Sequence, residues 1–189
     1  MEKRKIEVLG LSGSLRKQSS NMRLLSFIGR LMPDRIAFRM YDGLANLPHF
    51  NPDLDGGKTP IDAAVREWRE ALQRTDAIVI CTPEYARGVP GSLKNALDWV
   101  VSSGEFMHKP TAVLSVSPHP DGGATALHSL TLTLLMMSAA IPDGASLAVP
   151  FANSRIGPDG SVADDGVLAS LYKLVESLLL AVGETNSGS

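Results

Sequence analysis

A polar loop near the N-terminus carries the first residues able to bind a ligand. The apolar run Ile6–Leu11 is followed by small and hydroxylated residues, one arginine and a segment with helical periodicity. In α/β proteins this order builds phosphate sites, because unpaired N–H groups of the first helical turn face the anion. Gly13 lets the backbone approach an anion, and Arg16 offers a charged donor. Hydroxyl donors come from Ser14, Ser19 and Ser20. The loop predicts a monophosphate site, with an ordinary capped turn as the alternative.

A second loop, Pro83–Ser92, follows the apolar run Ala77–Thr82 and contains two prolines and two glycines in its first nine residues. These residues restrict its shape and let the backbone come close to a flat ligand. Tyr85 either packs near an aromatic ring or covers an edge of the core. Glu84 is a general base or, more commonly, a cap or an ion-pair partner. Arg87 is a solvated charge or holds an anionic co-substrate.

A third loop, Ser115–Ala124, offers Ser117 and the pair Gly122–Gly123 as small donors and open backbone. His119 lies between two prolines, which predicts a fixed and exposed side chain. The G-x-S-x-G pattern of a serine nucleophile is absent from the sequence, and the four histidines do not show the spacing of metal ligands. The loops therefore favour ligand binding over nucleophilic or metal catalysis.

The composition is that of an ordinary globular protein. The chain has 189 residues, 44% of them hydrophobic and 20% charged, and a net charge of -2, which gives no reason to expect a nucleic-acid or polyanion partner. We expect one domain, 1–183, and a disordered tail, 184–189. The single cysteine, Cys81, excludes an internal disulfide and fits a reducing cytoplasm. We interpret it as a small buried side chain rather than a reactive thiol. The sequence shows neither a signal peptide nor a membrane-spanning run, so we expect a cytoplasmic protein.

Strand-like runs alternate with helical patterns along the chain. The predicted strands are Ile6–Leu11, Ile36–Tyr41, Ala77–Thr82, Ala112–Ser117 and Ser146–Val149. The predicted helices are Asn21–Met32, Ile61–Arg74, Pro90–Val101, Ala124–Ala140 and Val167–Val182. This alternation predicts a three-layer, flavodoxin-like α/β fold with a five-stranded parallel sheet of order 2-1-3-4-5. Ligands bind beyond the carboxyl ends of such strands, where the three loops begin. Two longer connections remain, Gly43–Pro60 and the surface excursion Asn153–Asp165.

In combination, the loops resemble the NADPH-dependent FMN reductase family, the flavodoxin-like group that contains quinone, azo-dye and chromate reductases. The resemblance covers nearly the whole chain. The matching stretches are Gly13–Asn21, Thr82–Tyr85 with Val89–Trp99, Ser115–Pro118 with Gly122–Ala124, and Leu47–Asp53.

The resemblance implies a set of cofactor-binding residues. For the FMN phosphate these are Ser14, Arg16, Ser19 and Asn21. For the isoalloxazine ring and ribityl chain they are Pro83, Glu84, Tyr85 and Ala86, with Ser117 on the other side of the ring. Family members often have asparagine after Tyr85 and an arginine after the paired glycines, whereas this chain has Ala86 and Thr125. One side-chain contact to the flavin is therefore expected to be missing. The resemblance also implies a homodimer or a tetramer.

The implied function is an FMN-dependent NAD(P)H oxidoreductase with no acid–base pair of its own. Hydride passes from NADPH to flavin N5 and on to a quinone-like, azo, metal-oxyanion or free-flavin acceptor. We expect Arg87 to contact the 2′-phosphate of NADPH. The alternative is a non-enzymatic electron carrier, although such carriers are usually strongly acidic. A signalling receiver domain and a cysteine phosphatase are set aside, because the first loop lacks both an acidic cluster and a cysteine.

Overall fold

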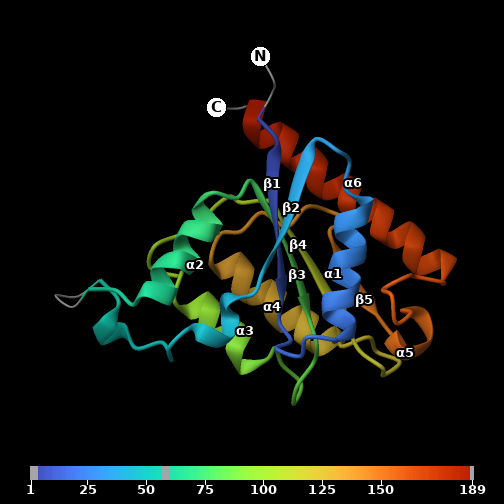
Figure 1. Ribbon diagram of the computed structural model, residues 1–189, viewed down its shortest axis with the longest axis horizontal. Helices are drawn as coiled ribbons and strands as arrows, with labels where there is room; N and C mark the ends of the chain where they lie inside the picture. The colour runs from blue at the N-terminus through green and yellow to red at the C-terminus, as the bar shows by residue number, and fades with distance from the viewer. Residues whose placement is uncertain (1–3, 57–59, 188–189) are drawn as a thin grey trace.

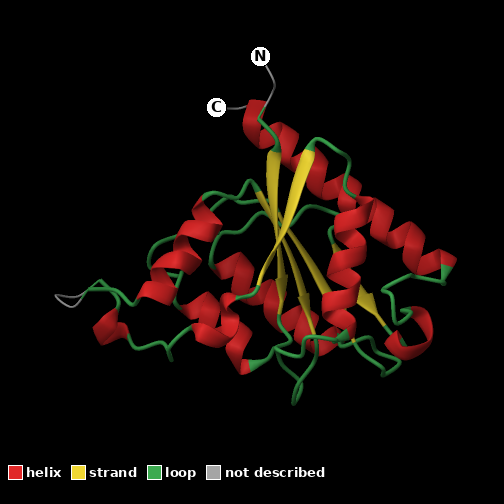
Figure 2. Cartoon of the chain, viewed as in Figure 1, coloured by secondary structure: helices red, strands yellow, loops and turns green. Residues whose placement is uncertain are grey.

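The computed structural model describes residues 4–56 and 60–187. Its core is a five-stranded parallel sheet of order β2-β1-β3-β4-β5, flanked by helices on both faces (Figure 2). The sheet confirms the predicted fold class and strand order. The strands are β1 (Ile6–Ser12), β2 (Ile36–Tyr41), β3 (Ala77–Thr82), β4 (Thr111–Val116) and β5 (Ser146–Val149).

The helices form the two outer layers of the fold. They are α1 (Ser20–Leu31), α2 (Ala63–Gln73), α3 (Gly91–Asp98), α4 (Ala124–Met136), α5 (Ala152–Arg155) and α6 (Asp165–Ser187). Two short 3₁₀ turns, η1 (Gly43–Asn46) and η2 (Pro52–Leu54), occupy the long connection after β2. In Figure 1, α1 and α6 lie on one side of the strands and α2 on the other, while all strand arrows point toward the end where α3 and α5 lie.

The central strands are apolar throughout because both faces of the sheet are covered. Successive side chains of β3 point to opposite faces. Val79 and Cys81 belong to the core that the sheet forms with α1 and α6, whereas Ile78 and Ile80 belong to the core formed with α2, α3 and α4. All six residues of β3 are buried, which explains why its sequence does not alternate.

Helix ends differ from the sequence-based expectation by a few residues. Pro90 lies at the N-cap of α3 rather than in its first turn, and α4 ends at Met136. The short helix α5 was not predicted and lies where we expected a surface excursion. Helix α6 continues through Ser187, into the segment where a tail was expected, and residues 188–189 lie outside the described part of the chain.

One helix of the described chain, α6, is long and apolar enough over Asp165–Gly183 to cross a membrane, by length and composition alone. Its apolar residues have another explanation. Leu171, Leu174 and Leu178 are fully buried in the core that α6 shares with α1 and the sheet. A helix that packs one face on a sheet requires such a stripe.

The strand register brings the ends of β1, β3 and β4 together. Ser12 pairs with Cys81, and Thr82 pairs with Ser115. Just beyond β1, the N–H of Gly13 donates to the carbonyl of Cys81 over 2.8 Å. A Cβ atom at Gly13 would lie 2.8 Å from Oγ1 of Thr82, so only glycine lets the two chain segments approach this closely. The three predicted loops therefore start from one edge of the sheet.

Candidate functional site: a cleft at the carboxyl ends of the strands

The three loops enclose a cleft of about 380 Å³ at the carboxyl edge of the sheet. This volume lies within the range of small-molecule sites. Every cofactor-binding residue predicted from the sequence, except Ala86, lines the cleft. The lining consists of Ser14, Arg16, Ser19, Ser20, Asn21, Pro83, Glu84, Tyr85, Val116, Ser117, Pro118, His119, Ala152 and Asn153.

Two buried serine hydroxyls at one end of the cleft each accept one backbone hydrogen bond. Oγ of Ser14 accepts from the N–H of Arg16 over 3.3 Å. Oγ of Ser19 accepts from the N–H of Met22 over 3.1 Å and so caps α1. Because the hydroxyl hydrogens have no acceptor among the described residues, both serines keep an O–H able to donate into the cleft.

Further donors at this end have no acceptor within the described chain. The backbone N–H groups of Ser20 and Asn21, at the start of α1, make no hydrogen bond to the described residues. The side-chain amide nitrogen of Asn21 is equally free there, whereas its oxygen is held by Cys81. Arg16 is exposed and forms no ion pair with any residue that the structure describes.

This donor set fits a phosphate dianion. Hydroxyl, amide and backbone hydrogens converge with one guanidinium at the positive end of a twelve-residue helix. The one carboxylate that lines the cleft, Glu84, comes from the loop after β3. A ligand without acceptor oxygens would leave these buried donors unpaired, and the guanidinium favours acceptors that carry negative charge.

Glu84 ties two of the loops together. Its Oε2 accepts a hydrogen bond from the backbone N–H of Ala126 over 3.0 Å, in the first turn of α4. The N-cap residue of α4 is Gly123, which has no side chain to cap the helix. The carboxylate therefore acts as a cap from a neighbouring loop, which agrees with one of the roles considered from the sequence.

The segment Tyr85–Gly88 is a tight hairpin turn. Tyr85 and Gly88 exchange two backbone hydrogen bonds of 2.9 and 3.0 Å. Between them Ala86 and Arg87 have φ angles of 50° and 65°, the left-handed pair that a type I′ turn requires. This turn projects beyond the strand ends in Figure 1. It places Ala86 and Arg87 in solvent, outside the cleft lining, and leaves half of the Tyr85 side chain exposed at its mouth.

The far wall of the cleft comes from the ends of β4 and β5. Oγ of Ser117 accepts from the N–H of His119 over 3.1 Å, and the carbonyl of Ser117 accepts from the N–H of Ala152 over 3.0 Å. The second of these bonds places α5, with Asn153, beside the loop after β4. Sequence reasoning missed α5 as part of the site. The available signal was its position directly after the carboxyl end of β5, next to β4.

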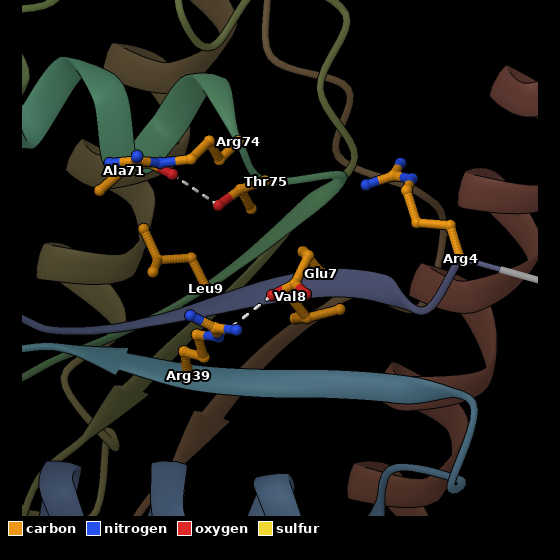
Figure 3. A pocket seen from close by; sticks show the side chains of 8 residues that line it. All are labelled: Arg4, Glu7, Val8, Leu9, Arg39, Ala71, Arg74 and Thr75. Atoms are coloured by element: carbon orange, nitrogen blue, oxygen red, sulfur yellow. Dashed lines mark hydrogen bonds and ion pairs between the residues drawn. The ribbon is translucent and has the colours of Figure 1, made fainter.

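A larger hollow, of about 600 Å³, lies at the opposite edge of the sheet and contains none of the predicted residues (Figure 3). Its three arginines already have carboxylate partners: Arg39 with Glu7 at 3.2 Å, Arg4 with Asp76 at 2.6 Å and Arg74 with Glu70 at 3.3 Å. Its guanidinium charges are therefore neutralised locally. We place the functional site in the smaller cleft.

The described residues contain no cluster of three or more His, Cys, Asp or Glu side chains placed to hold a metal ion. Cys81 is completely buried, and burial raises the pKa of its thiol. A thiol that keeps its proton is a poor nucleophile. The site thus offers mainly hydrogen-bond donors, which suits a protein whose bound cofactor carries the chemistry.

The family comparison identifies that ligand class. The family model described as NADPH-dependent FMN reductase matches residues 6–154, the segment that holds every cleft residue. The chain belongs to this family. It is an NAD(P)H-dependent oxidoreductase with FMN as its cofactor, and the donor-rich end of the cleft suits the FMN phosphate.

Individual relatives agree with the family assignment. A quinone reductase of Pseudomonas putida is 35% identical over 156 residues, which are 81% of this chain and 78% of the relative. An NAD(P)H-dependent FMN reductase of Pseudomonas aeruginosa is 31% identical over 179 residues, covering 94% and 95% of the two chains. Among solved structures, FerB of Paracoccus denitrificans, a flavoenzyme NAD(P)H:(acceptor) oxidoreductase, superposes with a TM-score of 0.83 at 29% identity, covering 95% and 98% of the chains.

Proposed function

We propose that residues 1–183 form one FMN-binding domain that transfers a hydride from NADPH to flavin N5 and then reduces a quinone-like, azo, metal-oxyanion or free-flavin acceptor. The observation that carries the proposal is the cleft itself, which gathers donors for a phosphate at one end and leaves Tyr85 exposed at its mouth. When bound, FMN supplies hydride acceptance from NAD(P)H and electron release to an acceptor.

Each part of the cleft has its own role in this proposal. Ser14, Ser19, Asn21 and Arg16 bind the phosphate and fix the cofactor's position along the cleft. Pro83, Glu84 and Tyr85 form one wall beside the flavin ring, and Ser117 lies on the wall opposite. In this proposal the residues only orient the cofactor and leave one face of its ring open, so the protein needs no catalytic acid–base pair.

Ala86 belongs to this proposal only through its backbone, because it does not line the cleft and lies at the tip of the turn. The turn nevertheless sets the direction of Tyr85, which begins it. A ring held in this way packs on a flat ligand at little conformational cost.

The decisive experiment is the visible spectrum of the purified protein, loaded with FMN and desalted. We expect yellow protein whose absorbance bleaches when NADPH is added without oxygen and returns when a quinone follows. Free FMN at the same concentration is the control for direct reduction. A folded protein that retains no FMN would contradict the proposal.

Arg87 is our candidate for the 2′-phosphate of NADPH. It lies exposed at the tip of the turn beside the cleft and makes no ion pair within the described chain. We expect Arg87→Ala to raise KM for NADPH several-fold more than KM for NADH. The control is Arg66→Ala, which removes an exposed arginine on α2. An equal effect of Arg87→Ala on both nucleotides refutes this role.

We also propose that the protein is a homodimer formed through α4. This helix carries no Asp, Glu, Lys or Arg, and it exposes Leu132, Leu135 and Met136 by more than half. Two copies of an uncharged apolar face meet around a two-fold axis without like-charge repulsion. Leu135→Glu should convert the dimer to a monomer in sedimentation velocity. Leu180→Glu on α6, a similarly exposed leucine on another helix, should leave the dimer intact.

The acceptor and the compartment complete the proposal. The open mouth of the cleft suits a planar acceptor that takes the same place as the nicotinamide, as expected for enzymes named quinone reductases. A reducing cytoplasm suits a chain whose single cysteine is unpaired and buried. Activity toward a quinone, an azo dye, chromate and free FMN, each measured at saturating NADPH, will rank the acceptors.

A further inference from the structure

The side-chain oxygen of Asn21 accepts a hydrogen bond from the buried thiol of Cys81. Asn21 lies in the first turn of α1, is 4% exposed and lines the cleft. Sγ of Cys81, on β3, donates a hydrogen bond to its Oδ1 over 3.2 Å. No other described residue donates to that oxygen, and none accepts from the amide nitrogen.

The thiol decides which end of the amide faces the cleft. An asparagine side chain can be turned so that either its oxygen or its NH₂ group points in a given direction. The sulfur–hydrogen donor favours the orientation with oxygen toward the core, and this leaves the two N–H donors for the cleft. An amide turned the other way would present an oxygen lone pair to an anionic ligand, which is repulsive.

Cys81 has the properties that such a donor needs. Its side chain is completely buried in the core beneath α1, and burial raises the pKa of the thiol, so the sulfur keeps its hydrogen. The backbone of Cys81 separately anchors the loop, because its carbonyl accepts from the N–H of Gly13. Replacing the side chain therefore leaves this backbone anchor in place, and Cys81→Ala removes the donor to Asn21 together with one buried atom of the core.

We propose that Cys81 is a positioning residue that orients Asn21 to donate its amide N–H to the phosphate of FMN. The proposal rests on the proposed function of the cleft and deepens it. Cys81 acts on cofactor affinity without touching the cofactor, which distinguishes it from the serines and Arg16 that line the cleft.

The test compares flavins with and without the phosphate. Flavin fluorescence quenching gives Kd values for FMN and for riboflavin with the wild type, Cys81→Ala, Cys81→Ser and Asn21→Ala. We expect Cys81→Ala to weaken FMN binding by about tenfold, the effect of losing one hydrogen bond to a charged group, while riboflavin binding changes less than twofold. Cys81→Ser, whose hydroxyl is also a donor, should restore most of the FMN affinity.

Two controls separate positioning from a general loss of structure. Val79→Ala removes buried volume from the same strand and the same face but takes no hydrogen bond from Asn21, so it should not discriminate between FMN and riboflavin. In a double-mutant cycle, Cys81→Ala should add nothing to the FMN defect of Asn21→Ala, because the amide it orients is then absent.

The outcomes are distinguishable from those that test the proposed function. If the wild type binds no FMN, the function of the cleft is wrong. If the wild type binds FMN, the inference on Cys81 is overturned by any of three results. These are equal losses of FMN and riboflavin, identical behaviour of the alanine and serine variants, or additive effects in the cycle.

Discussion

Oε2 of Glu84 lies 3.0 Å from the backbone nitrogen of Ala126, and this hydrogen bond joins the loop after β3 to the first turn of α4. The residues are 42 positions apart in the chain. One end of the bond is adjacent to Tyr85 at the cleft, and the other lies on the helix through which we propose dimerisation. The charged contact therefore links the wall of the cleft to the N-terminus of this helix.

Removing that carboxylate should loosen both segments. Glu84→Ala leaves α4 without a cap at its N-terminus, which costs about 1 kcal/mol and lowers Tm by roughly 2–4 °C in a chain of this size. Glu84→Gln keeps an acceptor oxygen and should lose less than half as much. Thermal unfolding followed by circular dichroism measures both, and equal losses would contradict the capping role.

Arg16 should contribute to FMN affinity through the phosphate alone. We expect Arg16→Ala to weaken FMN binding roughly ten- to hundredfold, the range for hydrogen bonds to charged groups, and to leave riboflavin binding unchanged. Lys17→Ala is the matched control, because this exposed neighbour does not line the cleft. Comparable losses for the two variants would mean that net charge, and not a specific contact, governs binding.

The turn at Ala86 holds a side chain in a backbone region that favours asparagine and glycine. Ala86→Asn should stabilise the protein by about 0.5–1 kcal/mol, because asparagine tolerates the left-handed conformation of a type I′ turn. Ala86→Val should destabilise it by about the same amount or more, since β-branched residues are strongly disfavoured at positive φ. Urea unfolding midpoints that shift in the same direction for both variants would contradict this geometry.

Alkaline pH should unfold the protein partly through Tyr41. Burial, followed by the nearby carboxylates of Glu67 and Asp42, raises the pKa of Tyr41 to about 12, from 10.0. The folded state thus disfavours the ionised phenol, and this contribution is complete below pH 10 and is lost as pH rises toward 12. Between these two pH values, the free energy of unfolding of Tyr41→Phe should fall by about 1 kcal/mol less than that of the wild type. Because the phenol is only partly buried, solvent screening makes this difference smaller than the pKa shift alone would give. Parallel stability curves for the two proteins would rule out this origin.

Much of the fold followed from the sequence because it depends on patterns that are local. Runs such as Ala77–Thr82 are apolar without alternation, and that property by itself requires a sheet covered on both faces. With five strands, the flavodoxin-like order 2-1-3-4-5 was then the natural choice, and the sheet has this order. Helix ends were less predictable, because a proline such as Pro90 is suited both to the N-cap position and to the first turn.

The site was predictable where loops follow strands and less so where contacts are long-range. The serine and arginine positions lie within eight residues of a strand end, so their convergence needed only the topology. By contrast, the thiol of Cys81 behind Asn21 joins residues 60 positions apart, and nothing in either local sequence indicates the pairing. The positive φ angles of Ala86 and Arg87 were equally hidden, since neither residue favours such a turn.

The last wall of the cleft has a consequence for how the protein is made. Asn153 completes a cavity that begins at Ser14, and α5 is held there by the bond from Ala152 to Ser117. A nascent chain that has emerged from the ribosome only as far as β4 therefore lacks the wall of the cleft that α5 supplies. We therefore expect full FMN affinity only after β5 has docked on the sheet, because α5 then supplies the remaining wall.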